Sequence, residues 1–214
     1  MANILIPYVI AFAITLISAI WAIVIWSRVE DRFTPLLIYF VLSAICEIPG
    51  NINFLILNKE PSNLIYNLFV LIEAFLWLWL FFKWKLFRNN TYLFYTLASS
   101  FVAVYIADFI ITGDMNTIFT AYRLYYGFVL VLLSIHHVNY QIVHETKNLI
   151  KSSSFLICIG LIIMFTNKIL LETFYLVFSE YSFGILVIVT LIFKSILMLA
   201  LLWMPTKPKG LHSL

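Results

Sequence analysis

Residues 64–82 read LIYNLFVLIEAFLWLWLFF, and this run decides the fold. Apolar side chains occupy every face of a helix built from it, and Glu73 is its acidic residue. An α-helix rises about 1.5 Å per residue, so a run of this length crosses a hydrocarbon core of roughly 30 Å. A strand of a membrane β-barrel instead alternates apolar and polar residues over about 10 positions. The run therefore predicts a transmembrane α-helix.

Similar apolar runs lie on both sides of it. They cover residues 4–26, 36–57, 92–111, 117–135, 155–177 and 183–203. Backbone groups in lipid must be hydrogen-bonded within the protein, which favours helices throughout. The sequence thus predicts an all-α membrane bundle of seven transmembrane helices over residues 1–204. An unstructured tail, rich in proline and glycine, should follow over 205–214, and the mixed stretch 136–154 predicts an extension of the fifth helix.

The composition is also typical of a membrane protein. Hydrophobic residues make up 64% of it and charged residues 11%, whereas soluble domains carry about 45–50% and about 25%. The mean hydropathy is +1.03. A net charge of +3, spread along the chain without a basic patch, excludes nucleic acid as an expected partner. The lipid bilayer is the expected surrounding.

Basic residues between the runs predict the orientation. Those on one side are Arg28, Arg32, Lys83, Lys85, Arg88, Lys147, Lys151, Lys207 and Lys209. The loops on the other side carry Lys59. Because loops rich in lysine and arginine stay in the cytoplasm, we expect the N-terminus outside and the C-terminus in the cytoplasm. The chain is predicted to be a multi-pass protein of the cell's inner membrane.

Ionisable residues inside the apolar runs are the candidate functional groups. They are Glu47, Glu73, Asp108, Arg123, Lys168, Glu172 and Lys194. Each would cost roughly 2.5–3.5 kcal/mol in the middle of a membrane unless it faced a partner or water. We therefore expect them to converge on a polar interior. The first two glutamates and Lys194 should lie near mid-membrane and the other four in the outer half, so this interior should open outward.

Helical spacing adds detail to the predicted pocket. Lys168 and Glu172 are four residues apart and should form a local ion pair. Pro49 and Gly50 should kink the second helix. Tyr66 lies seven residues before Glu73, and Asn51 four residues after Glu47, so each shares a helical face with its glutamate. The complete predicted pocket is Glu47, Asn51, Tyr66, Glu73, Asp108, Arg123, Lys168, Glu172 and Lys194. Arg123, among tyrosines, is also expected to reach the outer headgroups.

Motifs for enzymatic chemistry are missing from the sequence. His136 and His137 are adjacent and point in different directions, and His144 lies seven residues further, so a shared metal ion is not expected. The chain contains no HExxH motif, no GxSxG elbow and no phosphate-binding glycine loop. We expect no catalytic residue, no metal and no cofactor, and a protein that is not an enzyme.

Two resemblances add expectations. The placement of Lys194 on the seventh helix and Glu73 on the third resembles that of microbial rhodopsins, which implies a retinal Schiff base on Lys194 as an alternative. Thr190 stands where those proteins carry an aspartate. The stretches IYNLFVLIEAFLWLWLFF (65–82) and SSFLICIGLIIMFTN (153–167) resemble small uncharacterised seven-helix membrane proteins of Bacteroidetes. This second resemblance implies the fold and no activity.

The leading hypothesis is a membrane protein whose outward-opening polar pocket binds or conducts a small polar solute, an ion or a proton. The structural alternative is that the charges form salt bridges that lock helices together. A second hypothesis is a membrane sensor or defence accessory. It would act as a homo-oligomer or through a soluble cytoplasmic partner that contacts residues 136–151. A third is an intramembrane lipid-modifying enzyme.

Overall fold

The computed structural model describes residues 2–55, 63–87, 90–144, 149–173 and 175–207. It describes side chains in 6–7, 9–50, 63–87, 90–144, 149–173 and 184–207. The α-helices are α1 (Ala2–Ile25), α2 (Thr34–Leu55), α3 (Asn63–Lys83), α4 (Thr91–Thr112), α5 (Thr120–His144), α6 (Ser153–Thr173) and α7 (Tyr175–Leu202). Two short 3-10 helices, η1 (Asp31–Phe33) and η2 (Leu149–Lys151), complete the described elements. The prediction of an all-α fold is confirmed.

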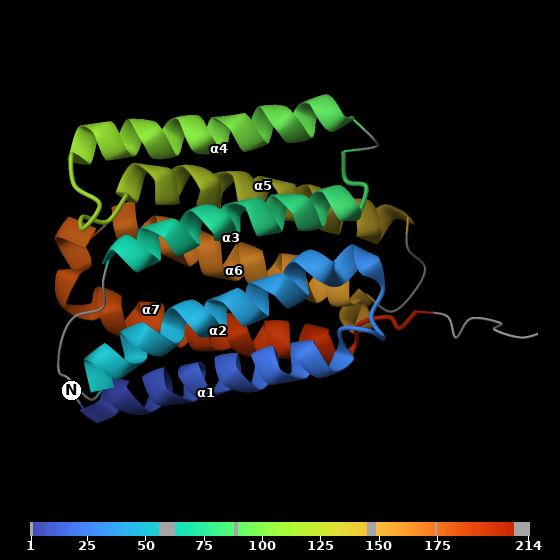
Figure 1. Cartoon of the computed structure of the whole chain (residues 1–214), viewed down its shortest axis with the longest axis horizontal. Helices are drawn as coiled ribbons and strands as arrows, with labels where there is room; N and C mark the ends of the chain where they lie inside the picture. Colours follow the sequence, from blue (N-terminus) through green and yellow to red (C-terminus); the bar gives the residue numbers. More distant parts are fainter. Residues whose placement is uncertain (1, 56–62, 88–89, 145–148, 174, 208–214) are drawn as a thin grey trace, which may run out of the picture.

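Six of the described helical segments are long and apolar enough to cross a membrane, and α1 contributes the further apolar segment Val9–Ile25. The helices lie side by side and reverse direction from one to the next (Figure 1). We call the end where the chain begins the N-terminal end of the bundle, and the end where the tail leaves the C-terminal end. The α1–α2, α3–α4 and α5–α6 connections lie at the C-terminal end.

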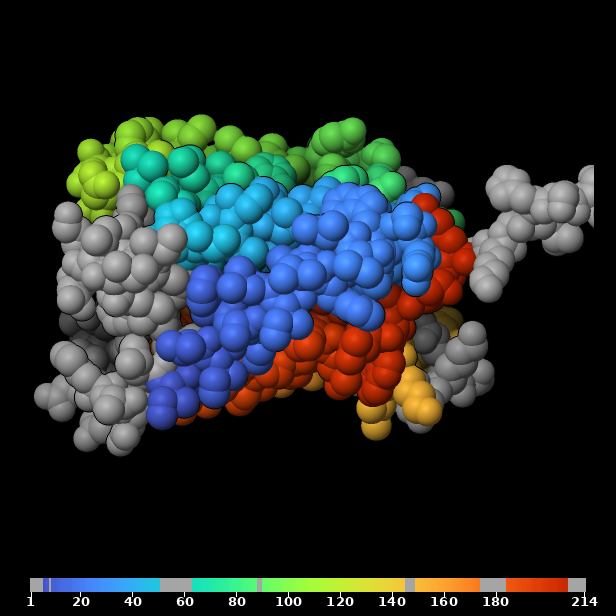
Figure 2. Space-filling model, turned by 60° about the horizontal axis from the view of Figure 1, so that its bottom comes forward, coloured from blue at the N-terminus to red at the C-terminus, as the bar shows by residue number. Residues whose placement is uncertain are grey.

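The order of helices in space differs from their order in the chain. The α5–α6 and α6–α7 pairs have the most extensive contacts, and α1 packs against both α2 and α7. Figure 2 shows α1 lying across α2 and α7 on one face of the molecule. At the opposite edge, α4 packs against α3 and α5. α3 packs against α2, α4 and α5, and α5 packs against α3, α4 and α6, so α3 and α5 lie between these two edges, where a buried site can form.

Helix ends follow local hydrogen bonding rather than hydropathy. The Asn90 side chain accepts a hydrogen bond from the Leu93 N–H at the start of α4, as expected of an N-cap. Gly113 closes the same helix with a φ of 69°, a left-handed conformation that glycine adopts without strain. At the far end of α5, the helix continues to His144. The predicted extension of the fifth helix is therefore confirmed over residues 136–144, whereas residues 149–151 form η2 and α6 already begins at Ser153.

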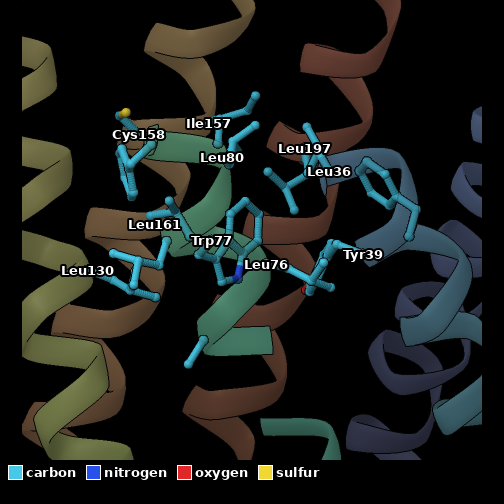
Figure 3. Packing of buried hydrophobic residues seen from close by; sticks show 14 of the residues in the cluster. Leu36, Tyr39, Leu76, Trp77, Leu80, Leu130, Ile157, Cys158, Leu161 and Leu197 are labelled. Atoms are coloured by element: carbon cyan, nitrogen blue, oxygen red, sulfur yellow. The ribbon is translucent and has the colours of Figure 1, made fainter. Parts of the chain in front are cut away.

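The core consists of large side chains from several helices. Trp77 and Leu80 of α3 pack with Leu130 of α5 and Leu161 of α6, all buried (Figure 3). Close approach of α5 and α6 depends on Gly127, where an added Cβ would lie 3.2 Å from the Phe165 side chain. Small residues of this kind let membrane helices pack closely.

The exterior is apolar. Large hydrophobic side chains are exposed along α1 and α4, among them Ile20, Ile23, Ile110 and Ile111. Water would make such a surface a site of aggregation, whereas lipid solvates it. The apolar helices and their apolar exterior are consistent with a multi-pass membrane protein.

The first residues of the tail are held in place. The Lys207 N–H donates to the Arg28 carbonyl (2.7 Å), and the Glu30 N–H donates to the Pro205 carbonyl (3.2 Å). Lys207 Nζ also lies 2.8 Å from an Asp31 carboxylate oxygen. The prediction of an unstructured tail is therefore wrong for residues 205–207, because their backbone pairs with the α1–α2 connection. Residues 208–214 lie outside the described part of the chain.

Candidate functional site

Glu73 lies near the middle of α3 and is only 7% exposed. Its carboxylate accepts hydrogen bonds from Trp77 Nε1 (3.4 Å) and from the Tyr126 hydroxyl (3.2 Å). Trp77 lies one helical turn further along α3, and Tyr126 is fully buried on α5. Within the described residues, no lysine or arginine makes a direct ion pair with this carboxylate. Glu73 is thus a buried acid held by neutral donors.

Tyr126 connects this acid to a buried cation. Lys168 Nζ of α6 donates to the Tyr126 hydroxyl at 3.3 Å, and the Lys168 side chain is buried. Its ammonium also lies 5.7 Å from the centre of the Tyr126 ring and 5.7 Å from that of Phe165. Aromatic faces attract cations, which favours the charge at this position. The result is a chain of hydrogen bonds from lysine to tyrosine to glutamate.

An ion pair lies between this chain of hydrogen bonds and the N-terminal end of the bundle. Arg123, near the start of α5, pairs with Glu172, near the end of α6, and both side chains are largely buried. The Arg123 guanidinium lies 5.2 Å from the centre of the Tyr66 ring, and the Lys168 ammonium lies 5.9 Å from it. We call Tyr66, Glu73, Arg123, Tyr126, Lys168 and Glu172 the α3–α5–α6 cluster.

Glu47 and Lys194 form a separate group between α1, α2 and α7. Lys194 Nζ lies 2.9 Å and 2.8 Å from the two Glu47 carboxylate oxygens. The same oxygens accept hydrogen bonds from the Thr15 hydroxyl of α1 (3.1 Å) and the Ser43 hydroxyl of α2 (3.0 Å). We call these four residues the α1–α2–α7 cluster. Its carboxylate is fully engaged by one cation and two hydroxyls.

Aromatic side chains separate the two clusters. The Tyr39 ring of α2 packs on Trp77 with ring centres 4.7 Å apart, and Trp77 meets Phe193 of α7 edge to face at 6.4 Å. Trp77 also donates to Glu73, and Tyr39 lies one helical turn before Ser43, which donates to Glu47. The Tyr39 and Trp77 rings, both labelled in Figure 3, therefore lie between the two clusters.

Asp108 has a different role. Its carboxylate accepts a hydrogen bond from the Tyr122 N–H (2.8 Å) in the first turn of α5. The first N–H groups of a helix lack partners within it, and the helix dipole favours negative charge there. Asp108 of α4 therefore caps α5 and fastens α4 to it.

The structure places the nine predicted pocket residues in several groups. Five of them, Tyr66, Glu73, Arg123, Lys168 and Glu172, lie in the α3–α5–α6 cluster. Glu47 and Lys194 pair in the α1–α2–α7 cluster, and Asp108 caps α5. The Asn51 side chain lies outside the described residues.

Several expected partnerships differ from the observed ones. Glu172 pairs with Arg123 rather than with Lys168, its neighbour one helical turn away. Arg123 consequently points to a carboxylate and not to headgroups. Lys194, which the rhodopsin-like layout sets opposite Glu73, contacts Glu47 instead. The reason is helix packing. Because α7 lies against α1 and α6, Lys194 is placed beside the α1–α2 hairpin, which carries Glu47.

Important polar partners were not singled out from the sequence. Ser43 lies four residues before Glu47 and Trp77 four residues after Glu73, a helical spacing that could have marked both. Asn67 of α3 donates to the Met115 (2.9 Å) and Thr117 (2.6 Å) carbonyls of the α4–α5 connection. Asn67 follows Tyr66 in the apolar run that predicts the helix. An amide inside such a run indicates a hydrogen-bond partner elsewhere in the protein, because buried polar groups are nearly always hydrogen-bonded.

Within the described residues, no group of three or more His, Cys, Asp or Glu side chains is placed to hold a metal ion. The fold and the buried charges define the class: an all-helical bundle consistent with a multi-pass membrane protein. Comparisons with protein families, curated proteins and solved structures found no match to this chain.

Proposed function

We propose that this chain is a multi-pass protein of the cell's inner membrane that takes up and conducts protons through the α3–α5–α6 cluster. The observation that carries the proposal is the Glu73–Tyr126–Lys168 chain, in which a buried carboxylate and a buried ammonium share one hydroxyl. A membrane charge without a direct counter-ion is costly, and such groups mark ion and proton pathways in membrane proteins.

The chain of hydrogen bonds supports a balanced proton transfer. Tyr126 gives its hydroxyl proton to the Glu73 carboxylate while it accepts one from the Lys168 ammonium. The hydroxyl is regenerated, the carboxylate becomes a carboxylic acid, and the ammonium becomes an amine. The pair of charges is converted into a pair of neutral groups, a change that burial favours. A proton that arrives from outside at Lys168 then restores the ammonium.

A proton fits the cluster better than a larger solute. Glu73, Tyr126 and Lys168 are buried and contact one another directly. A molecule the size of a sugar or amino acid would have to break these contacts to bind, whereas a proton moves along them. The rearrangement needed is the rotation of a hydroxyl group.

The position of the Arg123–Glu172 ion pair supports an entrance at the N-terminal end of the bundle, where both residues lie. The distribution of basic loops supports placing that end outside the cell. Protons would enter there, pass Tyr66, and reach Lys168. The α1–α2–α7 cluster has a different role in this proposal: its closed Glu47–Lys194 pair holds three helices together.

The test uses purified protein in liposomes that enclose a pH-sensitive dye. A potassium gradient with valinomycin drives proton entry. Glu73→Gln should lower the flux about 100-fold, the order expected when a positioned proton-transfer group is removed. Glu30→Gln is the matched control, because Glu30 pairs with Arg32 at an exposed connection, and its flux should equal that of the wild type.

Infrared spectroscopy gives a second readout that does not depend on flux. Acidification should produce a carboxylic acid C=O band in the wild type, and that band should be missing in Glu73→Gln. If Glu73→Gln kept the wild-type flux and the wild-type band, and lost only thermal stability, the cluster would be a structural network and the proposal would be wrong.

A further inference from the structure

A second set of buried polar groups lies on the same face of α5 as Tyr126. Going toward the C-terminal end, this face carries Leu130, Ser134, His137 and Gln141, all buried. Their spacing of three and four residues keeps them in one line along the helix. Polar residues thus occupy both halves of the α5 interior face, with Leu130 between them.

His137 is the most unusual member of this second set. It is 7% exposed, and its ring stacks on Trp84 with centres 4.8 Å apart and meets Phe81 edge to face at 6.4 Å. Neither ring nitrogen has a hydrogen-bond partner among the described residues. Buried polar groups nearly always have partners, and an imidazole offers two sites for a proton. Both ring nitrogens of this buried imidazole therefore remain available to take up or release a proton.

The remaining groups lead from His137 to the C-terminal end. Gln141 Nε2 donates to the hydroxyls of Ser154 (2.7 Å) and Ser152 (3.3 Å) at the start of α6. Lys151, which directly precedes Ser152 in the chain, is exposed. In the other direction, the Ser134 hydroxyl lies beside the Cys158 thiol of α6. Polar side chains therefore extend from the bundle end to the middle of α5.

An apolar layer separates this set from the α3–α5–α6 cluster. Leu130, Leu161, Trp77 and Leu80 fill it from three helices, and all four are buried (Figure 3). Tyr126 and Ser134 are eight residues apart, which is about 12 Å along a helix. That distance is too long for a direct proton hop and short enough for a transient file of water. Hydrophobic constrictions in channels open and close by wetting and drying.

We infer that the two polar sets are the two halves of one proton path along the buried face of α5, and that Leu130 and Leu161 form the hydrophobic gate between them. The inference rests on the proposed function, since it supplies the exit for protons taken up at Glu73. His137 accepts a proton at one ring nitrogen and releases one from the other, so the ring ends neutral after each transfer. Gln141, Ser152 and Ser154 then connect it to the cytoplasmic side.

The gate is tested in the same liposomes. Leu130→Ala combined with Leu161→Ala should raise proton flux about tenfold, which corresponds to a barrier lowered by about 1.4 kcal/mol. Leu132→Ala is the matched control, because Leu132 is 50% exposed on the outer face of α5, and it should leave the flux unchanged. If the double variant fails to fold, Leu130→Val with Leu161→Val makes a smaller opening and should raise flux in the same direction.

His137 is tested in the gate-opened variant. His137→Phe should return the flux to about the wild-type level, while His136→Phe, which changes the exposed neighbour, should have no effect. Glu73→Gln in the same background separates the two proposals. Flux blocked by Glu73→Gln but unaffected by His137→Phe would overturn this inference and leave the proposed function standing. Flux unaffected by Glu73→Gln would overturn the proposed function.

A folded gate variant with unchanged flux would overturn the gate. Size-exclusion elution and circular dichroism establish that each variant is folded before its flux is compared.

Discussion

Tyr126 is a single hydroxyl between two opposite charges, and its ring is packed independently of that role. The ring stacks on Tyr122 at 5.3 Å and meets Phe165 edge to face at 5.3 Å. Removal of the hydroxyl therefore breaks the hydrogen-bond chain and keeps the packing. This separation of chemistry from structure makes Tyr126 the best residue for a decisive substitution.

We expect Tyr126→Phe to abolish most of the proton flux while it lowers the free energy of unfolding by only about 1–2 kcal/mol, the cost of one lost buried hydrogen bond. Liposome flux and thermal unfolding in detergent measure the two effects. Tyr125→Phe is the control, because it removes a hydroxyl that bonds Ser100 (2.8 Å) outside the cluster. Equal flux in the two variants would contradict the relay.

A second prediction concerns the Glu47–Lys194 pair. Lys194→Met should destabilise the bundle by about 3 kcal/mol, because it leaves a carboxylate without its cation between packed helices. Lys194→Met combined with Glu47→Gln should recover a large part of that loss, since neither charge then remains. Thermal unfolding of both single variants and the double variant gives the coupling energy. Additive losses would show that the pair contributes no stability.

The sequence could predict which residues form the interior, and not which of them meet. Charged side chains in lipid must turn inward, and this physical rule selected Glu47, Glu73, Lys168 and Lys194 without any structure. Pairing depends on which helices become neighbours and on how each is rotated. Glu47 and Lys194 are 147 residues apart in the chain, and no local spacing rule reaches that distance.

At the scale of elements, Asn67 fixes how two helices are joined. Besides its two donated bonds, its side-chain oxygen accepts a hydrogen bond from the Phe119 N–H at the start of α5 (3.4 Å). One amide from α3 therefore holds the α4–α5 connection at several points. The start of α5 carries Tyr122 and Arg123, so this connection also positions the entrance of the proposed proton path.

We expect Asn67→Ala to increase amide hydrogen exchange in residues 113–122 and to destabilise the protein by about 1–3 kcal/mol, because backbone groups lose buried partners. Mass spectrometry of exchanged peptides reports the local effect. Asn63→Ala provides the comparison: Asn63 bonds the Asn116 carbonyl (2.7 Å) at an exposed position, so its loss should change exchange little. The same exchange in both variants would contradict this role of Asn67.

The sequence predicts where the helices lie more accurately than where each helix begins and ends. The runs 36–57 and 92–111 fall close to α2 and α4, because hydropathy marks the part of a helix that lipid surrounds. The same signal placed the start of the last helix at 183, and α7 begins at Tyr175. Polar residues such as Ser179 and Glu180 lowered the hydropathy there without ending the helix.

At the scale of the whole molecule, the basic residues at one end of the bundle predict its direction in the membrane. The α1–α2, α3–α4 and α5–α6 connections share that end with the tail. Lysine and arginine in short loops are retained in the cytoplasm. The proposed entrance for protons depends on this direction, because Arg123 and Glu172 lie at the opposite end.

Cysteine labelling tests the direction. In a chain whose Cys46 and Cys158 are replaced by alanine, we expect Asn116→Cys to react with a membrane-impermeant maleimide added outside intact cells. Lys151→Cys should react only after the membrane is permeabilised. Both positions are exposed, so access to the reagent depends on the side of the membrane. The reverse pattern would invert the bundle and place the entrance in the cytoplasm.

The packing of α1 against α7 has a consequence for biogenesis. During synthesis, α1 and α2 are made long before α7. Until α7 is complete, Glu47 therefore lacks the Lys194 cation with which it pairs in the finished bundle. By contrast, α3, α4 and α5 follow one another in the chain, so they can pack together as soon as they have been synthesised. Completion of the last helix is thus the event that closes the bundle. A chain interrupted before α7 lacks the cation that pairs with Glu47, so this carboxylate keeps its hydroxyl donors, Thr15 and Ser43, and loses its charge compensation.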